Sequence, residues 1–138
     1  MDCPCGSKLD YADCCGRFID AGQIAQTAEA LMRLRYTAYT KSDFNYLLTT
    51  WHSSTRPESL DEKQSQQWIG LKILRTEAGQ ADDSNGVVEF IARYKVNGRA
   101  FRLHETSRFV KEDGCWFYVE GIIQPVSAGI NLEKRCLK

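Results

Sequence analysis

The residues best suited to chemistry in this 138-residue chain are its cysteines, which are concentrated at the beginning. Four of the six lie within the first fifteen residues: Cys3, Cys5, Cys14 and Cys15. Zinc takes about four thiolate or imidazole ligands in a tetrahedron, and closely spaced cysteines supply them. Pro4 stiffens the first pair, while Gly6 and Gly16 permit the tight turns that would bring both pairs around one ion. The spacing therefore predicts a zinc site.

A disulfide cluster and a redox-active thiol pair are the two alternatives for these cysteines. Disulfides dominate small secreted chains, whereas this chain is longer and shows no secretory signal. The Cys-x-x-Cys spacing of redox motifs is also missing from the cluster. We therefore expect a cytoplasmic protein, in which cysteines are kept as thiols or bind metal.

Four thiolates would leave zinc no open position for water or substrate, so we expect one structural Zn²⁺ per chain. The segment has too few apolar residues to fold alone, and the ion would supply the folding energy. Replacing Cys14 by serine is then expected to unfold this segment and leave the rest folded. Cys115 and Cys136 are interpreted as an ordinary buried thiol and a thiol of the C-terminal tail.

The cysteine segment also resembles a known motif. Cys3-Pro4-Cys5-Gly6-Ser7, followed by Tyr11 and Cys14-Cys15-Gly16, is similar to the SEC-C zinc motif of the bacterial preprotein translocase ATPase SecA. The resemblance implies that the four cysteines are the metal ligands and that the motif docks onto proteins. That motif often carries Gly-Lys-Lys after the serine. Here Lys8-Leu9-Asp10 stands there, with one lysine, which weakens the argument for a basic surface.

The overall charge disfavours two classes of partner. Eighteen basic and eighteen acidic residues give a formal net charge of zero, so no strong general attraction to nucleic acid or an anionic membrane is expected. No apolar run approaches the length of a membrane span. We expect neither nucleic acid nor membrane as a partner.

Helical patterns occupy the first half of the chain. A connector over 17–26 precedes a predicted helix over 28–40, which Thr27 would cap and which carries a broad apolar stripe. Ser42 would cap a second, shorter helix carrying Phe44, Leu47 and Leu48. Capping-box spacing from Ser59 to Glu62 predicts a third short helix that ends near Gln67.

The second half has the period of two that is typical of strands. Strands are predicted over 68–76, 87–96, 99–110 and 115–123, with a type I′ hairpin turn at Asn97-Gly98 and another turn over 111–114. Helices followed by an antiparallel meander indicate an α+β fold.

A second resemblance covers nearly the whole chain. Leu31-Met32-Arg33-Leu34-Arg35-Tyr36, Trp51-His52, the run from Glu105 to Phe109 and the run from Trp116 to Gly121 resemble the uncharacterised bacterial YchJ family. The resemblance implies an NTF2-like cone, with helices across the concave face of a curved sheet. The implied organisation is a zinc knuckle over 1–20, an NTF2-like domain over 21–126 and a tail over 127–138. The tail holds only Cys136, so a second zinc site is not predicted.

Strand alternation singles out Glu105 on the third predicted strand, because this carboxylate shares a face with apolar residues. It shares a face with Phe101, Leu103, Ser107 and Phe109, whereas His104 lies on the other face. A carboxylate there must be hydrogen-bonded, paired or protonated. It either ties the helices to the sheet, through Trp51, Tyr36, Arg35 or a backbone group, or serves a ligand or catalysis.

The pocket of such a cone is predicted to involve five residues: Tyr36, Trp51, His52, Trp68 and Glu105. Glu105 and His52 are the candidate catalytic groups, although His52 also fits a helix-end histidine with polar contacts. Arg33 and Arg35, with Lys8 and Arg17, are interpreted as solvated charges rather than a nucleic-acid footprint.

Three functions remain open. The first is a zinc-binding, non-enzymatic protein-interaction module whose second domain has a possible small-ligand pocket. The second is an NTF2-like enzyme that uses Glu105 as acid or base, assisted by His52 or a tyrosine. The third is a weak nucleic-acid binder acting through the knuckle. The fold alone does not decide among them.

Overall fold

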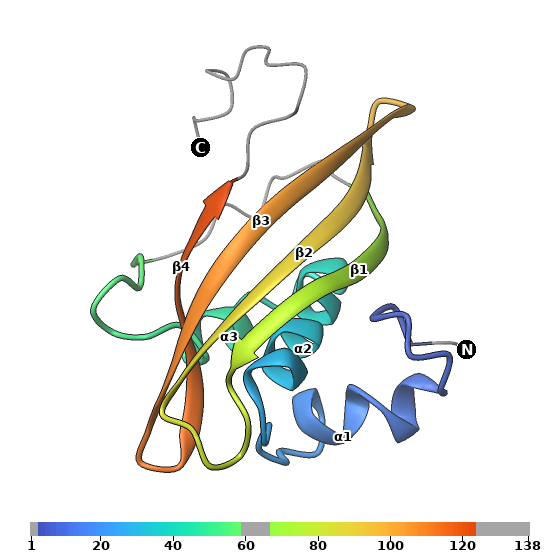
Figure 1. Ribbon diagram of the computed structural model, residues 1–138. Coiled ribbons are helices and arrows are strands. Elements are labelled where there is room, and N and C mark those ends of the chain that lie inside the picture. Colours follow the sequence, from blue (N-terminus) through green and yellow to red (C-terminus); the bar gives the residue numbers. More distant parts are fainter. Residues whose placement is uncertain (1–2, 59–66, 124–138) are drawn as a thin grey trace.

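The structure is a computed structural model that describes residues 3–58 and 67–123. Four antiparallel strands form one sheet in the order β1-β2-β3-β4: β1 (Gln67–Ala78), β2 (Asn85–Val96), β3 (Arg99–Glu112) and β4 (Cys115–Ile123). The sheet is long and strongly curved (Figure 1). The predicted α+β meander is therefore confirmed.

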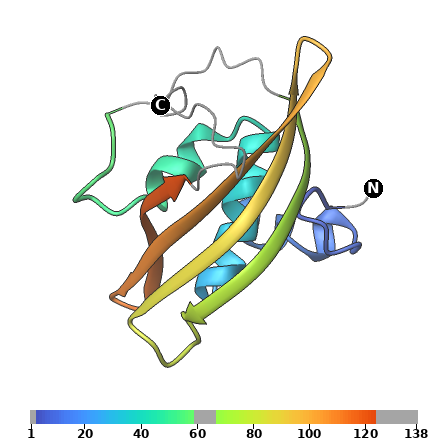
Figure 2. The ribbon, with the colours of Figure 1, turned by 45° about the horizontal axis from the view of Figure 1, so that its top comes forward.

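Two helices cover one face of the sheet. Helix α2 (Ala28–Thr40) lies across the concave side, and the shorter α3 (Phe44–Thr49) follows it (Figures 1 and 2). As predicted, Thr27 caps α2, because its hydroxyl accepts a hydrogen bond from the Ala30 amide at 3.1 Å. The predicted cap of α3 is wrong by one residue: Asp43 accepts from the Tyr46 amide, while Ser42 occupies a left-handed turn at φ 57°.

The core lies between α2 and the concave face. Helix α2 contributes Leu31, Met32, Leu34 and Tyr36, and the sheet contributes Val88, Phe90, Ala92, Phe109 and Trp116. The Trp116 indole also donates a hydrogen bond to the Gln26 carbonyl at 3.2 Å, which fixes the chain just before α2. A helix over a curved sheet leaves space near the middle of the concave face, and the cavity described in the next subsection occupies this space.

The start of α2 is held against the β1–β2 connection by two glycines. The Ala28 amide donates to the Gly79 carbonyl at 2.9 Å. A Cβ atom on Gly86 would lie 2.6 Å from the Gly79 Cα and 2.9 Å from the Ala28 Cβ. Only residues without a side chain permit this approach between helix and sheet.

The hairpin between β2 and β3 has the predicted turn. Asn97 and Gly98 both have positive φ, at 53° and 81°, as a type I′ turn requires. The strands pair without a shift from Val96↔Arg99 to Asn85↔Val110. Register shifts occur instead in β1 and between β3 and β4, where they increase the curvature of the sheet.

The N-terminal segment is more helical than expected. It contains a 3₁₀ turn, η1 (Tyr11–Asp13), and a four-residue helix, α1 (Gly16–Ile19), so the predicted connector over 17–26 begins as helix. The segment lies beside α2, next to β1 (Figures 1 and 2). The predicted third helix from Ser59 and the tail over 127–138 fall outside the described residues, except that Gln67 begins β1. Within the described ranges, no helix is long and apolar enough to cross a membrane.

Candidate metal centre and central cavity

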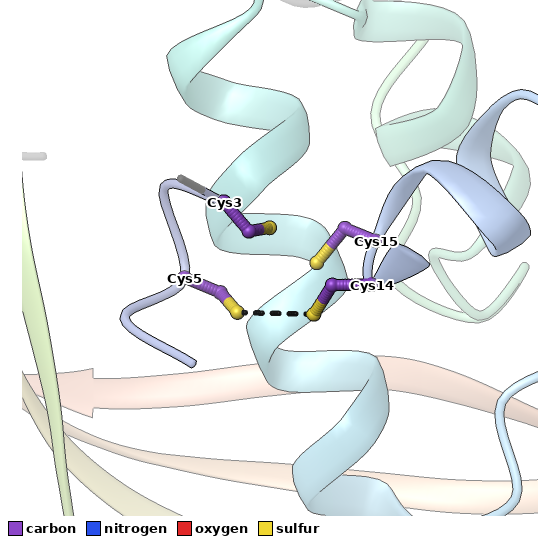
Figure 3. Close-up of side chains that lie close together, drawn as sticks. All are labelled: Cys3, Cys5, Cys14 and Cys15. Carbon is purple, nitrogen blue, oxygen red and sulfur yellow. Dashed lines mark hydrogen bonds between the residues drawn. The ribbon is translucent and has the colours of Figure 1, made fainter. Parts of the chain in front are cut away.

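The four N-terminal cysteines come together at one point. Cys3 and Cys5 lie on the first loop, Cys14 follows η1, and Cys15 precedes α1, so that all four sulfurs converge in front of α2 (Figure 3). The four Sγ atoms all lie within 4.8 Å of one another. The Sγ atoms of Cys5 and Cys14 are 3.7 Å apart.

This spacing fits a tetrahedral thiolate site. With zinc–sulfur bonds of about 2.3 Å, two ligands of one ion lie about 3.8 Å apart. A disulfide would require about 2.05 Å between sulfurs. All the described cysteines, including Cys115, are free thiols. The donor set and its dimensions therefore fit zinc, with each cysteine offering one sulfur.

Helix α2 supports the cluster from behind. The Thr37 hydroxyl donates to the Cys15 sulfur at 3.3 Å, and the Arg33 guanidinium donates to the Cys5 carbonyl at 2.9 Å. On the other side, the Ser7 hydroxyl donates to the Cys14 sulfur at 3.1 Å. These contacts orient the thiols, as outer hydrogen bonds do in metal sites.

The thiols also influence one another's protonation. A hydrogen bond from Cys15 lowers the pKa of Cys5 to about 4, even though burial opposes this change. The same hydrogen bond raises the pKa of Cys15, and burial raises the pKa of Cys14. Thiolates are the form that binds metal, so the lowered pKa of Cys5 favours metal binding.

The cluster is part of the core. Cys3, Cys5 and Cys15 are buried, Cys14 is half-buried, and the three buried cysteines pack in the same cluster as Leu31 and Tyr36. An ion held here would link the knuckle to α2. The predicted division at residue 20 stays a prediction, but the two parts share one core.

A second site is the cavity of about 410 Å³ between α2 and the sheet. It is lined by one cation, one carboxylate, hydroxyls and aromatic rings. The lining residues are Met32, Arg35, Tyr36, Tyr39, Trp68, Phe90, Ala92, Leu103, Glu105, Ser107 and Tyr118.

Arg35 is buried in the wall of this cavity, so its interpretation as a solvated charge is wrong. It is 3% exposed and donates hydrogen bonds to the Leu47 carbonyl and the Thr50 hydroxyl, both at 2.8 Å. Its guanidinium also lies against two rings, 5.0 Å from Trp51 and 4.5 Å from Tyr118. Burial lowers the pKa of Arg35 from its usual value, but an arginine stays charged.

Glu105 faces the cavity, as strand alternation predicts. Its carboxylate accepts a hydrogen bond from the Ser107 hydroxyl at 2.9 Å. Gly121 on β4 makes room for it, because a Cβ there would lie 1.7 Å from Oε2 of Glu105. Ser107, which the sequence reasoning did not propose, is thus one partner of the carboxylate, and Arg35, which it did propose, lies close enough to interact with its charge.

Two tyrosines, Tyr39 and Tyr118, add protonated hydroxyls to the lining of the cavity. Burial raises the pKa of Tyr39 and of Tyr118, so both stay neutral well above pH 7. Arg35 and Tyr39 lie one turn apart on α2, and Tyr118 lies on β4. Sequence reasoning missed this group, although the i, i+4 spacing of Arg35 and Tyr39 was a signal for a shared face.

Two of the five predicted pocket residues do not line this cavity. Trp51 packs edge-on against Tyr118, with ring centroids 5.0 Å apart, and the Arg35 guanidinium lies against both rings. His52 bonds through Nε2 to Glu112 at 2.8 Å and through Nδ1 to Ser54. His52 therefore does not line this cavity, and its contacts are those of the alternative, a helix-end histidine with polar partners.

His104 lies on the outer face of the sheet, as expected. Its Nε2 is 2.6 Å from the Glu89 carboxylate, so it pairs there rather than with Glu105. The remaining three predicted pocket residues, Tyr36, Trp68 and Glu105, line the cavity. Their roles stay predictions.

Two family descriptions match the chain. "SEC-C motif" matches residues 2–17, and "YchJ, middle NTF2-like domain" matches residues 27–121. The first match contains all four clustered cysteines, and the second contains every residue that lines the cavity.

Curated relatives resemble almost the whole chain. A UPF0225 protein of Chromobacterium violaceum is 54% identical over 126 residues, which cover 88% of this chain and 92% of the relative. A UPF0225 protein of Streptomyces coelicolor is 49% identical over 119 residues, covering 86% and 93%.

Two solved structures are similar. The solution structure of a SEC-C motif containing protein from Rhodopseudomonas palustris is 36% identical with a TM-score of 0.78, covering 88% of this chain and 98% of that one. The crystal structure of a SEC-C motif containing protein from Psychrobacter arcticus is 27% identical with a TM-score of 0.72, covering 99% and 94%.

Proposed function

The chain belongs to the YchJ-like UPF0225 family, and on this premise we propose that it is a zinc protein that docks onto another protein through its N-terminal knuckle. In this proposal the four cysteines hold one Zn²⁺ in a structural site. The observation that carries the zinc assignment is the convergence of four free thiols within 4.8 Å. Four thiolates complete the coordination of the ion, so it does no Lewis-acid chemistry.

A groove beside the knuckle supports the docking role. It has a volume of about 400 Å³ and is lined both by the knuckle and by the adjoining helix and strand of the NTF2-like part. The knuckle contributes Pro4 and Tyr11, α2 and its C-cap contribute Tyr36, Thr40 and Lys41, and β1 contributes Trp68 and Ile69. Ile69 is 47% exposed and Leu9 of the knuckle is 52% exposed. Of these two side chains, only Ile69 lines the groove, and an exposed apolar side chain at a groove is typical of interaction surfaces.

The charge of the knuckle indicates the kind of partner. Four thiolates and one Zn²⁺ carry about two negative charges together. Asp10, Asp13 and Asp20 are exposed on the same segment, against the exposed cations Lys8 and Arg17. We therefore infer a protein segment that inserts an apolar side chain into the groove and carries basic residues beside it. A phosphate backbone would be repelled.

The test uses two exposed apolar residues of the same strand. Ile69 lines the groove, whereas Leu74 is 41% exposed and does not line it. Ile69→Glu is expected to abolish crosslinking to the cellular partner, and Leu74→Glu is expected to retain it. Chelation of the metal should act like Ile69→Glu, because Pro4 and Tyr11 are positioned by the knuckle. A partner that binds both variants equally would overturn the docking proposal but not the zinc site.

The nucleic-acid alternative has its own test. At low salt, the chain should bind mixed single- and double-stranded DNA and RNA weakly. Tight binding that falls steeply with salt and disappears when the first twenty residues are removed would favour nucleic acid over a protein partner.

A further inference from the structure

The cavity between α2 and the sheet has the size expected of a second binding site, and it shares Tyr36 and Trp68 with the groove beside the knuckle. Its volume of about 410 Å³ lies in the range of small-molecule sites, roughly 300–1,000 Å³. None of the four clustered cysteines is among its lining residues. A ligand here would not touch the metal.

Hydrogen-bonding groups from three elements face this cavity. Arg35 and the protonated hydroxyls of Tyr39 and Tyr118 are donors, and Glu105 is an acceptor. The cation comes from α2 and the carboxylate from β3. A ligand in the cavity therefore meets both donors and an acceptor.

The two charged groups are held in place without a ligand. Arg35 is fixed by its bonds to Leu47 and Thr50 and by the ring of Tyr118. Glu105 is fixed by Ser107 and fits against the bare backbone of Gly121. Groups that are already ordered lose little freedom on binding, which favours affinity.

The charge balance of the cavity limits the ligand. One arginine and one glutamate line it, so their formal charges cancel. A charged ligand would lose its hydration on entry and find no net counter-charge. An uncharged ligand that has both an acceptor and a donor can form hydrogen bonds with both Arg35 and Glu105.

The apolar lining favours a flat body. Trp68 and Phe90 contribute ring surfaces, and Met32, Ala92 and Leu103 contribute aliphatic surface. Aromatic and aliphatic surfaces of this kind pack well against the face of a planar ring in a ligand.

We propose that this cavity binds a small, uncharged molecule with a flat apolar body and one edge that carries a hydrogen-bond acceptor beside a donor, as in a primary amide or a lactam. The acceptor is placed toward Arg35 and the tyrosine hydroxyls, and the donor toward Glu105. The apolar body lies against Trp68 and Phe90.

The test compares three probes of one size: benzamide, benzoate and benzylamine. Binding is followed by the indole N–H resonance of Trp68 in ¹⁵N-labelled protein. Trp116, whose indole bonds the Gln26 carbonyl, is the internal reference. Benzamide is expected to shift the Trp68 resonance saturably, and both charged probes to bind about tenfold more weakly or worse. The proposal fails if benzamide leaves Trp68 unshifted at millimolar concentration, or if either charged probe binds as tightly.

A glycine pair provides the matched variants. Gly121→Ala displaces the Glu105 carboxylate, whereas Gly70→Ala adds a methyl group with no atom within 4 Å. Benzamide binding should weaken about tenfold in the first variant and stay unchanged in the second. Leu103→Trp, which fills the cavity, should abolish the Trp68 shift and stands in if Gly121→Ala does not fold. Unchanged binding in the folded Gly121→Ala or Leu103→Trp protein would overturn the assignment.

Discussion

Arg35 is a cation whose position depends on two hydrogen bonds and two aromatic rings. Replacing it by methionine keeps most of the apolar stem but removes the charged donor from the Leu47 carbonyl and the Thr50 hydroxyl. We expect Arg35→Met to lower the free energy of unfolding by about 2–3 kcal/mol, because buried hydrogen bonds to charged groups contribute about that much. Chemical denaturation measures this change.

Arg108 is the control for that variant. It pairs with Glu120 at 3.0 Å, but both side chains are about half exposed, at 53% and 50%. Exposed ion pairs contribute about 0–1 kcal/mol, so Arg108→Met should have a small effect. Equal losses in the two variants would mean that the burial of Arg35 does not matter.

Glu89 should make stability depend on pH in the acid range. Hydrogen bonds with His104 and then Arg75 lower its pKa below the usual 4.5. A carboxyl whose pKa falls on folding stabilises the protein above its unfolded pKa and loses this contribution as pH falls through the folded value. We expect Glu89→Gln to be less stable than the wild type at pH 6. That difference should shrink below pH 4.5, as thermal melts at several pH values would show.

Strand alternation predicted the direction of Glu105 because a strand has only two faces. The sequence pattern did not predict the surroundings of Arg35. The apolar stripe of α2 is broad, and a charged residue at its edge is exposed or buried depending on which other elements pack against that edge. Here α3 and Trp51 cover it. The position of His52 next to Trp51 in sequence did not bring it to the cavity, because its side chain bonds Glu112 instead.

At the scale of elements, the junction of α2 with the β1–β2 connection should tolerate no added side chain at Gly86. A Cβ there would lie 2.6 Å from backbone, so Gly86→Ala must move the helix or the strand. We expect it to lower the free energy of unfolding by about 1–3 kcal/mol, as overpacking does. Gly70→Ala in β1 meets nothing within 4 Å and should stay within about 0.5 kcal/mol of the wild type.

Denaturant midpoints of the two glycine variants compare these outcomes under one condition. If Gly70→Ala proved as harmful as Gly86→Ala, loss of glycine in general, and not close packing at the helix start, would be responsible.

Elements with strong local signals were predicted almost to the residue. Thr27 and the period of α2, and Asn97-Gly98 between β2 and β3, each specify a conformation through their own backbone and side chains. Helix α1 was missed because its four residues carry no helical period of their own. It is held by Cys15 at its start and by packing beside α2, which are tertiary effects.

For the whole molecule, the shared core alters the expected effect of losing the metal. From sequence alone, Cys14→Ser should unfold the knuckle and spare the rest. Because Cys3, Cys5 and Cys15 pack with Leu31, we now expect a lower stability for the entire chain. Cys14→Ser or chelation should lower the midpoint reported by tryptophan fluorescence, since all three tryptophans lie outside the knuckle.

Cys115→Ser is the matched control, because Cys115 is a half-buried thiol on β4 outside the cluster. It should leave that midpoint nearly unchanged. A tryptophan midpoint that is insensitive to chelation would show instead that the two parts fold independently.

The zinc content of the purified chain, measured by native mass spectrometry together with thiol alkylation, tests the central claim most directly. We predict one zinc ion per chain, four N-terminal thiols protected from alkylation, and loss of both properties in the double variant Cys5→Ser/Cys14→Ser. Protein purified without chelator that holds no metal, and in which Cys3, Cys5, Cys14 and Cys15 all react freely, would contradict the account.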